Sequence, residues 1–423
     1  MSNVLYDLLS NVPIPPVIKI RQHFPAQRIT DVPQAVREQL QRPEVLSTLK
    51  PGQRIAVTVG SRGIAKLPEI VGTVVQFLKD QGTSPFIIPC MGSHGGATAQ
   101  GQREVLAGLG ITEDTMGVPI RASMETVEIG VTTKGIPVYV DKFAHEADGI
   151  VVINRVKPHT AFRGRYESGL MKMLTIGLGK QHGAEICHAA GFKYMHENMP
   201  AAAMVILAKE PILFGVATVE NAYDEPMLIR ALTKEEIPDQ EPGLLELARE
   251  NMPRLPFEHM DVLIVDEIGK NISGDGMDPN VTGRYASPYA SGGPEVEKIV
   301  VLDITDESHG NGNGLGMADF TTQRAYRKFD FLMTYPNAIT STLANTVRVP
   351  MVLDSDRLAI QAAIKTCNRL NHSQVEMVRI KNTLKVSEML ISPPLVEPVK
   401  QLPDVEIVSG PQLLEFDAQS NLL

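Results

Sequence analysis

Tryptophan is absent from this 423-residue sequence, and aromatic residues make up only 5% of it. Basic residues are not in excess either, because the formal net charge is -9. A general nucleic-acid binder needs a basic face that neutralises phosphates, and usually aromatic side chains on which bases stack. We therefore expect no nucleic-acid partner.

Cysteine is scarce, and Cys90, Cys187 and Cys367 lie far apart with no CxxC pair. This pattern predicts neither a disulfide framework nor a cysteine-rich zinc site. No apolar run approaches the roughly 20 residues of a membrane span, and the first residues lack the basic and apolar regions of a secretory signal. We expect a soluble protein without a membrane partner, in a reducing compartment that is most simply the cytoplasm.

The chain does contain short β-branched runs that alternate with helical patterns. Continuous apolar runs are typical of strands buried on both faces of a parallel sheet. The expected strands are residues 54–60, 85–90, 149–156 and 212–219, then 261–268, 298–304, 347–355 and 375–380, with helices from about residue 67 and at 356–370.

A segment rich in proline and charge, residues 235–260, separates the two series and is expected to contain only a short helix. The sequence thus predicts an α/β fold with two α/β domains, mostly parallel sheets and an active-site cleft between the domains. We place the domains at residues 1–255 and 256–394. The proline-rich tail, residues 395–423, is expected to pack back on the first domain.

Reactive residues follow several expected strands, where ligands bind in parallel α/β sheets. "GSRGIAK" places Arg62 before a helix, where a guanidinium fork and helix amides attract anions. "CMGSHGGAT" surrounds His94 with glycines, and Pro158 stiffens the approach to His159. Each also has an ordinary alternative role: a surface ion pair for Arg62, or a helix-capping loop position for His94.

The segment that follows His159 adds an amine and further imidazoles. Lys172 lies in an apolar stretch, where desolvation would lower its pKa and make it nucleophilic, although it could equally extend to solvent from a helix edge. His182 and His188 are candidate metal ligands that are, taken singly, more often structural. In the second series, Lys270 lies in one of two glycine-rich loops, neither of which fits GxGxxG.

These motifs together resemble the lactate racemase family. Its "D-x-T-R"-like loop corresponds to "VGSR", ending at Arg62, and its "G-T-H" to "GSH", ending at His94. Its "PH" followed by "SGG-x-K" corresponds to Pro158-His159 and then "SGLMK", ending at Lys172. The resemblance covers the first domain well and the second only in outline.

The resemblance implies an isomerase, a racemase or epimerase that inverts C2 of a 2-hydroxy acid. Its cofactor would be a nickel-pincer nucleotide, a pyridinium mononucleotide that binds nickel through two sulfurs and a ring carbon, and whose ring takes up a hydride. His94 and His159 would be the catalytic acid/base groups on opposite faces of the substrate. Arg62, with Lys270 from the second domain, would bind the substrate carboxylate.

The resemblance also assigns the residues that hold the cofactor. Lys172 would bind it, in the family through a thioamide, and we add Ser61 and Ser168 of the same motifs. His188 lies at the distance along the chain that corresponds to the nickel ligand, so we prefer it to His182.

Several positions depart from the family pattern. Val59 replaces the aspartate before the arginine, and Leu170 replaces the second glycine of "SGG". The stretch before Lys172 is a few residues longer and carries Arg163 and Arg165. These extra cations would suit a larger or more polar hydroxy acid, such as a sugar acid, rather than lactate.

Two other functions start from the same residues. A cofactor-free protein could bind an anionic metabolite through Arg62 and helix N-termini. A metal-dependent hydrolase could use several histidines, but it needs carboxylate ligands beside them, and only Glu185 is close in sequence. The expected partners are the small-molecule 2-hydroxy acid and, transiently, the cofactor-synthesis proteins. Whether the chain forms a homo-oligomer is left open.

Overall fold

The computed structural model describes residues 4–61 and 63–423, which form two compact units. The inserted unit consists of Ala26–Met252 and Thr340–Thr342. The terminal unit consists of the chain up to Pro25 together with Pro253–Ile339 and Leu343–Leu423. Arg62, the expected carboxylate ligand, lies outside the described residues.

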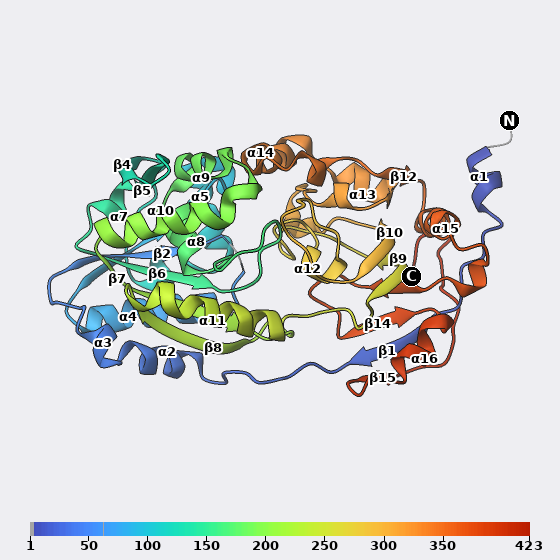
Figure 1. The fold of residues 1–423 in the computed structure, drawn as a ribbon, viewed down its shortest axis with the longest axis horizontal. Helices are drawn as coiled ribbons and strands as arrows, with labels where there is room; N and C mark the ends of the chain where they lie inside the picture. The colour runs from blue at the N-terminus through green and yellow to red at the C-terminus, as the bar shows by residue number, and fades with distance from the viewer. Residues whose placement is uncertain (1–3, 62) are drawn as a thin grey trace. The chain divides into compact units, whose positions relative to one another are not determined.

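The inserted unit is built on a five-stranded sheet in the order β3 (Ser84–Pro89), β2 (Arg54–Val59), β6 (Gly149–Arg155), β7 (Ile212–Glu220) and β8 (Pro226–Thr233). The first four strands are parallel, and β8 is antiparallel to β7. The four predicted strands are all found, because their apolar runs are buried on both faces. The apolar stripe of α4 (Leu67–Asp80) packs in the same core as β2 and β3 (Figure 1).

Other segments of this unit cover the sheet or stand beside it. β4 (Thr126–Val131) and β5 (Pro137–Asp141) form a separate hairpin. The helices are α2 (Val32–Leu40), α3 (Pro43–Leu46), α5 (Ala99–Gly108), α6 (Glu113–Met116), α7 (Lys142–His145), α8 (Leu170–Lys172), α9 (Lys180–Ala189), α10 (Met195–Lys209) and α11 (Glu236–Asn251), with a π-helix at Met173–Gly177. α11 replaces the short helix expected in a linker, because it packs on β7 and β8 of this unit.

The terminal unit has an eight-stranded sheet in the order β12 (Met351–Leu353), β11 (Phe320–Thr322), β10 (Glu295–Val301), β9 (His259–Val265), β13 (Met377–Ile380), β14 (Glu388–Ile391), β1 (Ile18–Gln22) and β15 (Val405–Ile407). The strands from β12 to β13 are parallel, and the last three pairings are antiparallel. The predicted α/β class with mostly parallel sheets is therefore confirmed.

Helices of the terminal unit are α1 (Val4–Leu9), α12 (Pro279–Thr282), α13 (Gln323–Lys328), α14 (Phe331–Ser341), α15 (Asp356–Thr366) and α16 (Val396–Val399). Ser355 caps α15 by accepting a hydrogen bond from the Leu358 N–H. Within the described part of the chain, every helix is too short or too polar to cross a membrane.

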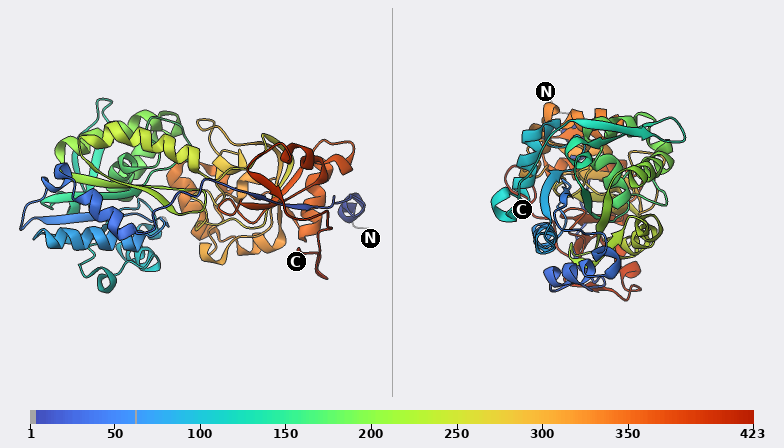
Figure 2. Two further views of the ribbon diagram at one scale, coloured as in Figure 1. Left: turned by 90° about the horizontal axis from the view of Figure 1, so that it is seen from below. Right: turned by 90° about the vertical axis from the view of Figure 1, so that its left-hand side faces the viewer.

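Both ends of the chain join the terminal unit, which differs from the predicted boundaries. Ile18 pairs with Ile391 and Ile20 with Ile407, so β1 lies between β14 and β15. The blue N-terminal strand accordingly lies among red strands in Figure 1 and within the same unit in Figure 2. The physical reason is that backbone pairing of β1 completes the sheet formed by residues after 253.

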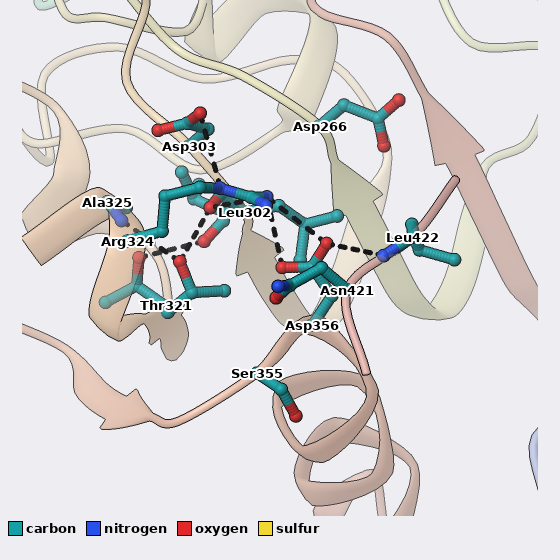
Figure 3. Close-up of polar contacts among 12 residues, drawn as sticks. Asp266, Leu302, Asp303, Thr321, Arg324, Ala325, Ser355, Asp356, Asn421 and Leu422 are labelled. Carbon is teal, nitrogen blue, oxygen red and sulfur yellow. Dashed lines mark hydrogen bonds and ion pairs between the residues drawn. The ribbon is translucent and has the colours of Figure 1, made fainter. Parts of the chain in front are cut away.

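The C-terminal tail is also held on the terminal unit rather than on the first predicted domain. Figure 3 shows Asp356, at the start of α15, accepting a 2.9 Å hydrogen bond from the Leu422 N–H. Arg324 donates to both oxygens of Asp356, at 3.1 and 3.2 Å. The guanidinium of Arg357 lies 4.0 Å from the centre of the Phe416 ring. These contacts bind the tail to α15.

Candidate active site

The predicted catalytic segments meet at one edge of the five-stranded sheet. Ser61 follows β2, His94 follows β3 and His159 follows β6. Because β3, β2 and β6 are adjacent and parallel, their carboxyl ends lie side by side.

His159 is buried in a loop that a carboxylate organises. Its backbone N–H donates to Glu167 Oε2 at 2.7 Å, and its carbonyl accepts from Arg163 Nη1 at 2.7 Å. Glu167 is fully buried and also pairs with Arg249. Arg163, one of the extra cations, thus contributes to the structure of the loop itself.

The His159 ring lies against the amine of Lys172, with Nε2 2.7 Å from Nζ. Its Nδ1 accepts a 3.0 Å hydrogen bond from the Ala161 N–H, so in the neutral ring the hydrogen is on Nε2. Burial, and then the charge of Lys172, hold the pKa of His159 well below its usual range, which keeps the ring neutral. Nζ of Lys172 and Nε2 of His159 therefore share one hydrogen bond.

The short helix α8, which carries Lys172, is fixed at its start. Glu241 of α11 accepts a 3.0 Å hydrogen bond from the Met171 N–H, and Asn154 donates to the Gly169 carbonyl at 2.8 Å. Burial raises the pKa of Glu241 to about 7. Ser168, a predicted cofactor residue, exchanges two backbone hydrogen bonds with Lys157.

His188 has the hydrogen-bonding pattern of a metal ligand. Its Nδ1 donates to the Ala184 carbonyl at 2.6 Å, which presents Nε2 as the acceptor. Burial lowers the pKa of His188 to about 4, so the ring is neutral at physiological pH. His182 is instead exposed, with its ring 4.4 Å from that of Tyr139. This geometry favours His188 over His182.

The His94 loop approaches the same turn of α9. Gly92 has a positive φ of 58°, and a Cβ placed there would lie 3.7 Å from the Ala184 side chain. Ala184 is the residue whose carbonyl accepts from His188. His188 and His159 are further linked through Phe192, whose ring centre lies 5.5 Å and 6.0 Å from theirs.

Lys270 belongs to the terminal unit, in the loop after β9. Its amine donates to the Gly274 carbonyl at 2.6 Å, and its N–H donates to Ser308 Oγ at 2.9 Å. A substrate contact from Lys270, and the cleft between the domains, stay predictions.

A grouping of metal-ligand type occurs elsewhere. Among residues 4–61 and 63–423, His259, Asp261 and Glu376 of the terminal unit are the one such set. Arg369 already pairs with Asp261 at 2.8 Å and with Glu376 at 3.3 Å. Its positive charge disfavours a cation there, which weakens the case for a metal-dependent hydrolase at this set.

Several structural partners of the site were not predicted from the sequence. Glu167, Glu241, Gln102 and Lys180 are buried polar residues that bind the loops and helices carrying the candidate catalytic groups. The one signal available was Glu167, a carboxylate directly beside a cluster of cations.

Comparison with known proteins concerns the family and the fold. Residues 14–199 match the lactate racemase N-terminal domain. The structure is similar to the lactate racemase apoprotein from Thermoanaerobacterium thermosaccharolyticum, with a TM-score of 0.53 and 15% identity over 88% of this chain and 99% of that one. No curated protein matches the sequence.

The fold is therefore that of a two-sheet α/β protein of the lactate racemase type. The match of residues 14–199 to the lactate racemase N-terminal domain confirms the resemblance seen in the motifs of that part of the chain.

Proposed function

We propose that this protein is a racemase or epimerase that inverts C2 of a 2-hydroxy acid and carries a nickel-pincer nucleotide. The observation that carries the proposal is the convergence of Lys172, His159 and His188 around Phe192 and α9. The match of residues 14–199 to the lactate racemase N-terminal domain supports the same reaction class.

The residues present fit this cofactor. Lys172 offers an amine that lies 2.7 Å from Nε2 of His159, and attachment of the cofactor to it would require the neutral, nucleophilic form of that amine. His188 offers Nε2 of a neutral ring, which would be a suitable ligand for the nickel of this cofactor. When bound, the cofactor would supply the hydride acceptor.

The remaining steps fall to side chains of this chain. His94 and His159 would each hold the proton of the substrate hydroxyl on one face, as acid in one direction and base in the other. Arg62 would bind the carboxylate, and Ser61 and Ser168 would contact the cofactor.

The preference for a larger or sugar acid over lactate now depends on fewer residues. Arg163 is engaged with the His159 carbonyl and Glu167, whereas Arg165 is exposed. Among these two extra cations, we assign a substrate contact only to Arg165.

The test is to produce the protein together with cofactor-synthesis proteins and to offer enantiopure 2-hydroxy acids, from lactate to sugar acids. Chiral chromatography should show inversion at C2 only with the nickel-loaded protein. Loaded protein that inverts none of these acids would contradict the proposal. Tight anion binding without nickel or turnover would favour the cofactor-free binding protein instead.

A further inference from the structure

A lysine is fully buried at the start of α9, the helix that carries His188. Lys180 donates to the Pro89 carbonyl and to Gln102 Oε1, both at 2.7 Å, and lies 3.5 Å from Asp141 Oδ2. Its backbone adopts a positive φ of 55°, which non-glycine residues rarely do. A buried cation in a strained conformation is costly, so its contacts must be specific.

The partner of Lys180, Gln102 of α5, is also fully buried. Its Nε2 donates to the Gly92 carbonyl at 3.0 Å and to the His94 carbonyl at 3.3 Å. Because an ammonium group only donates, Lys180 fixes which way this amide points: the oxygen toward the lysine, the NH₂ toward the loop. Two carbonyls of the His94 loop are thereby held.

Backbone packing makes the same loop intolerant of displacement. A Cβ at Gly101, in α5, would lie 2.0 Å from the Gly95 carbonyl oxygen. The loop therefore contacts α5 backbone to backbone on one side, and at Gly92 it reaches Ala184 of α9 on the other.

From these contacts we propose that Lys180 and Gln102 are positioning residues. They hold the loop that carries His94 at a fixed position relative to α9 and its His188. The catalytic role of His94 in this proposal rests on the proposed function. The support that Lys180 and Gln102 give to the His94 loop rests on the structure alone. Asp141, whose Oδ1 caps α7 through the Phe143 and Ala144 N–H groups, balances the lysine charge.

The first variant is Gln102→Glu, which keeps an oxygen for Lys180 but loses the NH₂ donors. In the cofactor-free protein, amide hydrogen exchange of residues 92–96 should rise by about tenfold or more, since two hydrogen bonds are lost. In the loaded enzyme, kcat should fall about 10- to 100-fold because a small displacement of a catalytic group has that effect. KM and nickel content should change little.

The second variant is the pair Lys180→Met and Asp141→Asn, which removes the cation without leaving a buried unpaired carboxylate. It should raise exchange in the same residues. Thr83→Val is the matched control, because Thr83 is buried and donates to the Leu78 carbonyl at 2.7 Å away from this loop. It should lower the melting temperature without changing exchange at residues 92–96 or kcat.

Unchanged amide hydrogen exchange of residues 92–96 in both test variants would show that Lys180 and Gln102 do not hold this loop. Faster exchange with an unchanged kcat would overturn the positioning role. If the wild-type enzyme inverts no 2-hydroxy acid, the proposed function and the positioning role fail. The exchange measurement still decides whether Lys180 and Gln102 hold the His94 loop.

Discussion

The amine of Lys172 lies 2.7 Å from Nε2 of His159, although the two residues are 13 positions apart in the chain. The Ala161 N–H donates to the other ring nitrogen, Nδ1, at 3.0 Å. The pair places a candidate general base beside a candidate covalent anchor.

If Lys172 forms the covalent link, intact-protein mass spectrometry under denaturing conditions should show a cofactor-sized mass increase in wild type and none in Lys172→Ala. His159→Ala should reduce the fraction that carries the added mass, because the Lys172 amine then loses the imidazole that lies 2.7 Å from it. The control is Lys66→Ala, which alters an exposed lysine. Bare chain from an active sample would mean that the cofactor is held non-covalently.

His188→Ala should lose nickel while the fold survives, because the imidazole of His188 is the expected protein ligand, whereas its hydrogen bond to the Ala184 carbonyl is a contact within α9. His182→Ala is the matched control on the same helix and should keep near one nickel per chain. Elemental analysis and thermal unfolding measure the two effects. Full nickel in His188→Ala would transfer the assignment to another residue.

A substrate that carries deuterium at C2 should yield product that keeps most of its deuterium in ordinary water. The carbon-bound hydrogen beside a carboxylate is a poor acid, so its removal as a proton would create a carbanion next to a negative group. If His94 and His159 each hold the hydroxyl proton on one face, as proposed, His94→Ala and His159→Ala should each lower the rate about 10²- to 10⁴-fold. Mass spectrometry follows the label, and complete exchange with solvent would point to proton abstraction from carbon.

Glu241 should make the stability of the protein fall with rising pH. Burial raises its pKa from 4.5 to about 7 in the folded state, so the folded protein binds the proton more tightly than the unfolded chain. The free energy of unfolding should therefore decrease between pH 4.5 and about 7, by up to roughly 3 kcal/mol, and then level off.

Urea unfolding of wild type and Glu241→Gln at several pH values isolates this effect as a difference. Glu250→Gln, which changes an exposed carboxylate on the same helix, should follow the wild-type curve. A difference between wild type and Glu241→Gln that is constant from pH 5 to 8 would show that Glu241 does not titrate in this range.

The sequence alone predicted the buried parallel strands, because strands such as β2 and β6 are continuous apolar runs rich in β-branched residues. It also placed His94 and His159 after strands, and a loop after a parallel strand must emerge at the carboxyl edge of the sheet. Periodicity and chain order suffice for both inferences, since each depends on local pattern.

Tertiary structure decided what depends on distant partners. β1 pairs with β14, some 370 residues away in the chain. Its short alternation of isoleucine with lysine and arginine does not indicate which strand it pairs with. Glu241, Gln102 and Lys180 are ordinary polar residues in the sequence. Only in the folded chain are they buried beside backbone groups that need a hydrogen-bond donor or acceptor. Those backbone groups determine which hydrogen bonds each side chain makes.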